Sequence, residues 1–344
     1  MSERLGGLLE FGLAGVVIFA RNYRSVEELR ALIAEIRYAA AAKPVLIGID
    51  QEGGQQFALA PPFTQWPSAA ELGRVGDAAL VEEIARAMAR ELRAAGANLD
   101  FAPMLDLHVQ SESPITRERS FGADANLVAR MGLAFSHGLR AGGVFACAKH
   151  FPGHGDTRID PHLDLPTLSG TLERLNAAEL VPFAAAIADA VPMIMTAHIL
   201  LPKVDAARPA SLSRRILTGL LRGQMNFGGV ILADDLGMGA IAKNYGAGQA
   251  AIETIAAGTD LVMLGHNEAD IEPAVEAVLR AFEAGRFDAG EWDASAGRIE
   301  RLRAAAEFGV GAGAADGGDT GVIGCAEHRA LSEAAFRRVS EVQG

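Results

Sequence analysis

The sequence predicts a parallel α/β protein, and a TIM-type (β/α)8 barrel is the leading form. Between residues 15 and 264, short apolar runs rich in β-branched residues recur along the chain. Polar and apolar residues do not alternate within these runs, as expected for strands buried on both faces of a sheet. Longer segments with helical periodicity separate the runs, and this alternation is typical of sheets whose parallel strands are connected by helices.

Seven runs are the predicted strands: Gly15–Phe19, Pro44–Asp50, Asn98–Phe101, Gly143–His150, Pro192–His198, Gly229–Asp234 and Asp260–Leu264. The predicted helices are Ser25–Ala40, Ala78–Ala95, Ala125–Ala141, Leu172–Ala190, Arg214–Met225, Ala247–Ala257 and Ile271–Ala284. In the first helix, Ser25 can cap the N-terminus, and an apolar stripe runs from Leu29 to Ile36.

An eighth strand has little room in this chain. It would have to lie before Gly15, and the segment there looks more helical than extended. We therefore expect a barrel that lacks its first strand, or one that closes in an unusual way.

Beyond the last strand, the composition indicates a change of organisation. We expect a catalytic barrel domain over residues 1–308, which ends in a charged helix, Asp293–Glu307. Residues 309–325 are rich in Gly and Ala and are expected to form a connector. A C-terminal helix over residues 326–344 is then expected to pack on the barrel.

The composition excludes several classes of partner. The chain has 344 residues, half of them hydrophobic, which is ample for a large core. Its net charge of −12 gives no electrostatic reason to bind nucleic acid or an anionic membrane. Two cysteines and no recognisable secretion signal favour a cytoplasmic protein.

Charged and polar residues gather where the predicted strands end. The second strand ends in Asp50 and leads to Glu52, the fourth ends in Lys149-His150, and the sixth ends in Asp234. Active sites of barrels lie at the C-terminal ends of the strands. Because such charges are costly to desolvate unless they are paired or bind a ligand, their grouping predicts a site for a polar ligand.

These residue types suit attack at the anomeric carbon of a sugar. That reaction needs a carboxylate on one face and a proton donor near the leaving oxygen. Asp234, close to cations, suits the carboxylate, and Asp50, Arg119, Lys149 and His150 suit the sugar hydroxyls. Two residues remain candidates for the proton donor. Glu52 qualifies by residue type, and His162 qualifies because Asp160, two positions earlier, can orient its imidazole.

A metal site is the competing interpretation of the stretch KHFPGHGDTRIDPH. Its residues His150, His154, Asp156 and His162 carry atoms that zinc accepts as ligands. However, they lie on a Gly- and Pro-rich loop, and no helix presents two of the histidines on one face. We therefore expect no metal here.

The motifs GVVIFARN, IDQEGG, NLDFAPMLDL, RSFGAD, KHFPGHGDT, DPHLDLP, MTAHI and ADDLGM occur in this order between Gly15 and Met238. With them, the chain resembles the single-domain β-N-acetylglucosaminidases of glycoside hydrolase family 3. The resemblance implies a barrel, retention of anomeric configuration, and no metal or organic cofactor. It makes Asp234 the nucleophile, His162 the general acid/base and Asp160 its partner. The residues expected to bind the N-acetylglucosamine hydroxyls are Asp50, Arg119, Lys149 and His150.

The sequence departs from the family pattern in two places. Members usually carry a basic residue shortly after EGG, whereas here Gln55–Leu59 has none and the next is Arg74. The short N-terminal segment also lacks the family's usual first strand.

Three functional hypotheses follow. The first is a hydrolase that releases terminal β-linked N-acetylglucosamine from muropeptide fragments of peptidoglycan or from oligosaccharides. The second is a phosphorylase on the same scaffold, since a neutral histidine does not repel incoming phosphate. The third is a catalytically weak sugar-binding protein, favoured by the altered segment after EGG. For each we expect a small carbohydrate partner and a monomer or weak homodimer.

Overall fold

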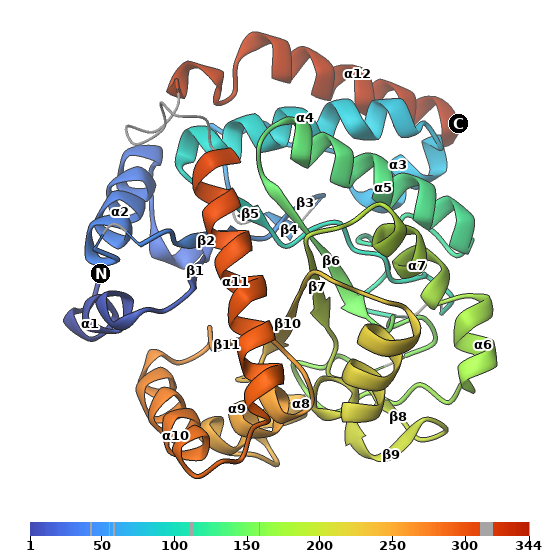
Figure 1. The fold of residues 1–344 in the computed structure, drawn as a ribbon. Coiled ribbons are helices and arrows are strands. Elements are labelled where there is room, and N and C mark those ends of the chain that lie inside the picture. The colour runs from blue at the N-terminus through green and yellow to red at the C-terminus, as the bar shows by residue number, and fades with distance from the viewer. Residues whose placement is uncertain are drawn as a thin grey trace.

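All seven predicted strands form and pair in chain order into one parallel sheet (Figure 1). The computed structural model describes residues 1–41, 43–54, 56–57, 59–110, 113–157, 159–309 and 319–343. The strands are β1 (Gly15–Ile18), β2 (Leu46–Ile49), β5 (Leu99–Asp100), β6 (Phe145–Phe151), β7 (Met193–Thr196), β10 (Val230–Asp235) and β11 (Leu261–Met263). This curled sheet, surrounded by helices, confirms the predicted TIM-type architecture without its first strand.

The helices lie outside the sheet, as Figure 1 shows. Those at predicted positions are α2 (Val26–Ala39), α4 (Ala78–Ala95), α5 (Ala125–Ala141), η3 (Arg215–Gln224, a π-helix), α9 (Ala247–Ala256) and α10 (Ile271–Glu283). Shorter helices are α3 (Ala69–Val75), α8 (Gly239–Ala242) and the 3-10 segments Ala20–Asn22, Ala210–Leu212, Glu268–Asp270 and Thr320–Val322. Ser25 caps α2 as predicted, since its side chain accepts the Glu28 N–H.

The predicted helix Leu172–Ala190 is wrong as a single element. It is divided into α6 (Leu172–Ala177) and α7 (Leu180–Ala188). Pro182 gives the physical reason, because its ring has no N–H and would clash with the carbonyl of Ala178 in a continuous helix. The chain leaves helical geometry at Ala178, with φ −143° and ψ −81°.

Two short hairpins, which the sequence did not predict, extend the ends of two sheet strands. β3 (Gln51–Gly53) pairs antiparallel with β4 (Gln56–Phe57) just beyond β2. β8 (Leu200–Leu201) pairs with β9 (Asp205–Pro209) just beyond β7. Both add chain at the C-terminal end of the sheet, where the polar residues are grouped.

α11 (Ala289–Gly309) covers the opposite, N-terminal end of the sheet. Its Leu302 and Ala306 pack into the same apolar cluster as Leu46, Phe101 and Leu232 of the sheet interior. Arg298, on the same helix, bonds to Asp260 just before β11. The N-terminal end of the sheet is therefore covered by α11.

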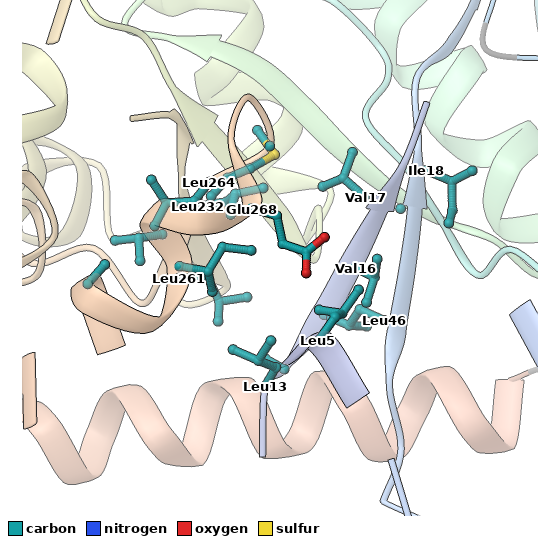
Figure 2. Close-up of a pocket in the computed structure, with 18 of the residues that line it drawn as sticks. Leu5, Leu13, Val16, Val17, Ile18, Leu46, Leu232, Leu261, Leu264 and Glu268 are labelled. Atoms are coloured by element: carbon teal, nitrogen blue, oxygen red, sulfur yellow. The ribbon is translucent and has the colours of Figure 1, made fainter. Parts of the chain in front are cut away.

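The sheet is open between its first and last strands. In the described chain, the segment before β1 is a helix, α1 (Glu3–Phe11), which confirms the prediction for these residues. A cavity of about 700 Å³ lies along the opening. Figure 2 shows Val16 and Val17 of β1 on one side of this cavity, with Leu261 and Leu264 on the other. An eighth strand is what a barrel of this type would place there.

α12 (Ala326–Gln343) packs on α3 and α4. Its His328 donates from Nδ1 to Glu91 of α4 at 2.7 Å, and both side chains are buried. Most of the predicted connector 309–325 lies outside the described residues. Among the described helices, none combines the length and apolar character needed to cross a membrane.

Candidate active site

Four of the predicted site residues lie at C-terminal ends of the parallel strands. Asp50 follows β2 directly, Lys149 and His150 lie near the end of β6, and Asp234 is the penultimate residue of β10. Successive parallel strands carry these ends to one side of the sheet, opposite α11. The predicted grouping on one rim is therefore present.

A buried ion cluster joins three of the predicted sugar-binding residues through Glu52. Lys149 Nζ lies 2.5 Å from Asp50 Oδ1 and 2.6 Å from Glu52 Oε1. Arg119 donates to both carboxylate oxygens of Glu52, at 2.8 and 2.7 Å. The side chains of Lys149 and Glu52 are buried, whereas that of Asp50 is 41% exposed. The Asp50 carboxylate is therefore exposed, while its partner Lys149 is held in the buried cluster.

The contacts in this cluster favour the charged forms of Glu52 and Lys149. Burial alone would raise the pKa of Glu52, but the charges of Arg119 and Lys149 hold it well below its usual range. Burial alone would lower the pKa of Lys149, but the two carboxylates raise it above its usual value. Glu52 is thus a buried carboxylate locked between cations. A carboxylate held ionised in this way argues against Glu52, the first of the two candidates for the proton donor.

The loop KHFPGHGDT is wrapped around Asp106, which is fully buried. His150 donates from Nδ1 to Asp106 Oδ2 at 2.7 Å, and the backbone N–H of His154 donates to Oδ1 at 2.7 Å. Burial lowers the pKa of His154 to about 4, so its ring is neutral at pH 7 and hydrogen-bonds Thr157. These contacts give Asp106 and His154 a role in shaping the loop.

Asp234 keeps its charge although it is partly buried. Burial alone would raise its pKa, but the neighbouring His150, His198 and Lys149 and a backbone N–H lower it. That N–H belongs to Asp235 and donates to Asp234 Oδ1 at 2.8 Å. The carboxylate is therefore ionised and fixed at the strand end, as a nucleophile requires.

His162 and Asp160 form a pair on the loop that follows β6. His162 Nδ1 lies 2.8 Å from Asp160 Oδ1, and the backbone N–H of His162 donates to the same oxygen at 2.9 Å. The side chain of His162 is 59% exposed. With Nδ1 held by the carboxylate, Nε2 is the nitrogen available for proton transfer to a ligand.

Backbone hydrogen bonds tie this loop to the turn after Asp234. The N–H of Gly239 donates to the His162 carbonyl at 3.3 Å, and the N–H of Ala240 donates to the Pro161 carbonyl at 3.0 Å. Gly239 permits the approach, because a Cβ at that position would lie 2.5 Å from the His162 oxygen. These contacts join the loop that carries His162 to the start of α8, which follows Asp234 in the chain.

Sequence reasoning missed a further aspartate–histidine pair. His266 follows β11, and its Nδ1 lies 2.5 Å from Asp235 Oδ2. The strand-end rule that selected the other residues, applied to the last strand, would have pointed to His266. In the described part of the chain, no three His, Cys, Asp or Glu side chains are placed to hold a metal ion.

The open rim of the curled parallel sheet carries an ionised aspartate, a histidine–aspartate pair and a buried ion cluster. This combination defines a barrel enzyme suited to glycoside chemistry. The sequence matches the glycosyl hydrolase family 3 N terminal domain over residues 4–302. The chain therefore belongs to glycoside hydrolase family 3, and the predicted enzyme class, a glycosidase, is confirmed.

Individual relatives agree with this placement. A beta-hexosaminidase of Thiobacillus denitrificans is 38% identical over 258 residues, which cover 73% of this chain and 71% of that protein. One from Nitrosospira multiformis is 36% identical over 261 residues, 74% of each chain. The structure of a glycoside hydrolase family 3 beta-N-acetylglucosaminidase from Paenibacillus sp. str. FPU-7 is 40% identical, with a TM-score of 0.93. That match covers 98% of this chain and 65% of the Paenibacillus chain.

Proposed function

We propose that this protein is a retaining β-N-acetylhexosaminidase in which Asp234 is the nucleophile and His162, oriented by Asp160, is the general acid/base. The observation that carries the proposal is the docking of the His162 loop on the turn after Asp234, through the Gly239 and Ala240 N–H groups. A proton donor and a carboxylate are the two groups that glycoside cleavage with retention needs, and this contact joins the segments that carry them.

In the first step, the Asp234 carboxylate attacks the anomeric carbon as the bond to the leaving oxygen breaks. Protonated His162 gives the proton on Nε2 to that oxygen, which leaves as an alcohol. Neutral His162 then takes a proton from water, the oxygen of which displaces Asp234 from the sugar. Asp160 supports both steps, because a carboxylate on Nδ1 fixes the tautomer and stabilises the imidazolium.

The ion cluster is the proposed platform for the sugar ring. Lys149 uses two of its three N–H donors on Asp50 and Glu52, which leaves one for a hydroxyl group. The Asp50 carboxylate, exposed above Lys149, can accept from two neighbouring hydroxyls. Arg119 and His150 complete the set, each oriented by a carboxylate, Glu52 and Asp106 respectively.

The proposed substrate is a terminal β-linked N-acetylglucosamine, since similar proteins carry the names beta-hexosaminidase and beta-N-acetylglucosaminidase. Within that class we propose peptidoglycan fragments as the natural source, met in the cytoplasm. Two free cysteines suit such a reducing compartment.

The test compares turnover of a chromogenic β-N-acetylglucosaminide with that of the matching β-glucoside, each with and without phosphate. We expect faster cleavage of the N-acetylglucosaminide, free sugar as product and no dependence on phosphate. A sugar 1-phosphate product would instead identify a phosphorylase. Asp234→Ala is expected to lower turnover about a thousandfold or more, roughly 4 kcal/mol of barrier. Unchanged turnover would identify a binding protein.

A further inference from the structure

Two aspartate–histidine pairs lie next to each other at the rim. The Asp160–His162 pair belongs to the loop after β6, and the Asp235–His266 pair joins the end of β10 to the segment after β11. The two imidazole centroids are 6.3 Å apart, with planes inclined by 43°. This separation falls within the range of direct contact between aromatic rings.

His266 is fixed from several sides although its side chain is 52% exposed. Asp235 is buried, and its Oδ1 accepts the N–H of Gly237 at 2.8 Å. The backbone of Gly237 lies so near that an added Cβ would be 2.8 Å from the Cβ of His266. On the other side, Arg21 donates to the Gly265 carbonyl at 2.7 Å. The imidazole of His266 is therefore anchored to the turn that follows Asp234.

His162 lacks such an anchor from its own partner. Asp160 lies two residues away on the same loop, so it fixes the tautomer and rotation of the ring but moves whenever the loop moves. The backbone contacts from Gly239 and Ala240 hold the loop but not the imidazole ring, so a side chain outside the loop can help to set the position of the ring relative to Asp234. His266 is placed for this, because it contacts the His162 ring and is held by Asp235, the residue after Asp234.

We propose that His266 is a positioning residue for proton transfer: its ring, held by Asp235, sets the place of His162 relative to Asp234. This inference rests on the proposed role of His162 as general acid/base. His266 acts only through His162, so its removal should impair the step in which the leaving oxygen takes a proton. Cleavage that needs no proton should continue.

The test uses phenyl and 2,4-dinitrophenyl β-N-acetylglucosaminide, because dinitrophenolate leaves without protonation. We expect His266→Ala to lower kcat/KM about tenfold for the phenyl substrate, which is within the range of coupling between contacting residues. For the dinitrophenyl substrate, kcat/KM should fall less than about twofold. His266→Asn, which can still donate to Asp235, should show the same loss because the ring contact is gone. His137→Ala removes another aspartate-paired histidine, on α5, and should change neither rate.

A double-mutant cycle completes the design. In a His162→Ala background, His266→Ala should cause no further loss on the phenyl substrate, since the group through which it acts is absent. An equal loss on both substrates, or an undiminished loss in the His162→Ala background, would overturn the inference. If His162→Ala itself shows no dependence on the leaving group, the proposed function fails, and this inference fails with it.

Discussion

Gly239 and His162 are joined by a backbone hydrogen bond of 3.3 Å, so the loop with the proposed acid/base rests on the turn that follows the proposed nucleophile. The two residues are far apart in the sequence, and neither lies in a strand of the sheet. The position of the proposed acid/base relative to the proposed nucleophile therefore depends on contacts between these two segments, of which this is one. A change at Gly239 tests that dependence without removing any reacting group.

Gly239→Ala should lower kcat while leaving the fold intact. The new Cβ would lie 2.5 Å from the His162 carbonyl oxygen and 3.0 Å from that of Leu163, so the loop must move away. We expect a loss of about tenfold to a hundredfold, because small misplacements of a catalytic group have effects of this size. Gly246→Ala is the control, since a Cβ there meets nothing within 4 Å. Equal rates for the two variants would contradict the account.

Asp160→Asn should impair catalysis more than binding. Burial alone would raise the pKa of Asp160, but the hydrogen bonds from His162 lower it, so the carboxylate is charged when it supports the imidazolium. We expect kcat to fall about a hundredfold, within the range for general acid–base catalysis, with little change in KM. Glu82→Gln alters an exposed carboxylate on α4 and should leave kcat unchanged. Steady-state kinetics distinguish the two outcomes.

Glu52→Gln should destabilise the protein strongly. The change removes the carboxylate that Arg119 and buried Lys149 share and leaves Lys149 with Asp50 alone, and breaking such a cluster costs about 3–5 kcal/mol. Denaturant unfolding at pH 7 measures the loss. Glu82→Gln breaks an exposed pair with Arg86 and should cost less than about 1 kcal/mol. Similar losses for both variants would show that the Glu52 cluster contributes little.

The stabilisation from Glu52 also has a predicted pH dependence. Its pKa in the folded state lies below the value in the unfolded chain, so the contribution is complete above about pH 4.5 and is lost as the pH falls further. Denaturant unfolding from pH 6 down to pH 3 should show a smaller acid loss for Glu52→Gln than for the parent. An identical acid loss would rule out this assignment.

His154 should weaken the fold as the solution is acidified. Its pKa is about 4 when buried in the folded state, whereas an unfolded histidine takes up a proton near pH 6.5. The unfolded state therefore binds more protons between these values, and the free energy of unfolding falls as the pH drops from about 6.5 to 4. His154→Gln should flatten this slope, and an unchanged slope would contradict the assignment. Unfolding curves across this range provide the measurement.

The strands could be predicted from the sequence because strands buried on both faces produce unbroken apolar runs, such as GVVIF and PVLIGID. The helix Leu172–Ala190 was mispredicted because apolar periodicity continues through Ala178, while Pro182 prevents one continuous helix. The hairpins beyond β2 and β7 were missed since their strands have as few as two residues, too short for a periodic pattern.

Candidate site residues could be predicted where they lie at the end of a predicted strand, as Asp50, Lys149 and Asp234 do. Residue type alone misplaced Glu52, because its role depends on Arg119 and Lys149, which only the folded chain brings within hydrogen-bonding distance. The contact between Gly239 and His162 could not be predicted either. It joins an irregular loop to the first residue of the short helix α8, and no local sequence pattern shows which segments meet.

The most direct test of the central claim is the trapping of the sugar on Asp234. His162→Ala should cleave 2,4-dinitrophenyl β-N-acetylglucosaminide readily in the first step but release the sugar slowly, because no base activates water. Peptide mass spectrometry of the quenched enzyme should then find one N-acetylglucosamine residue attached to Asp234. An unmodified Asp234, a label on another residue or a product of inverted configuration would contradict the account.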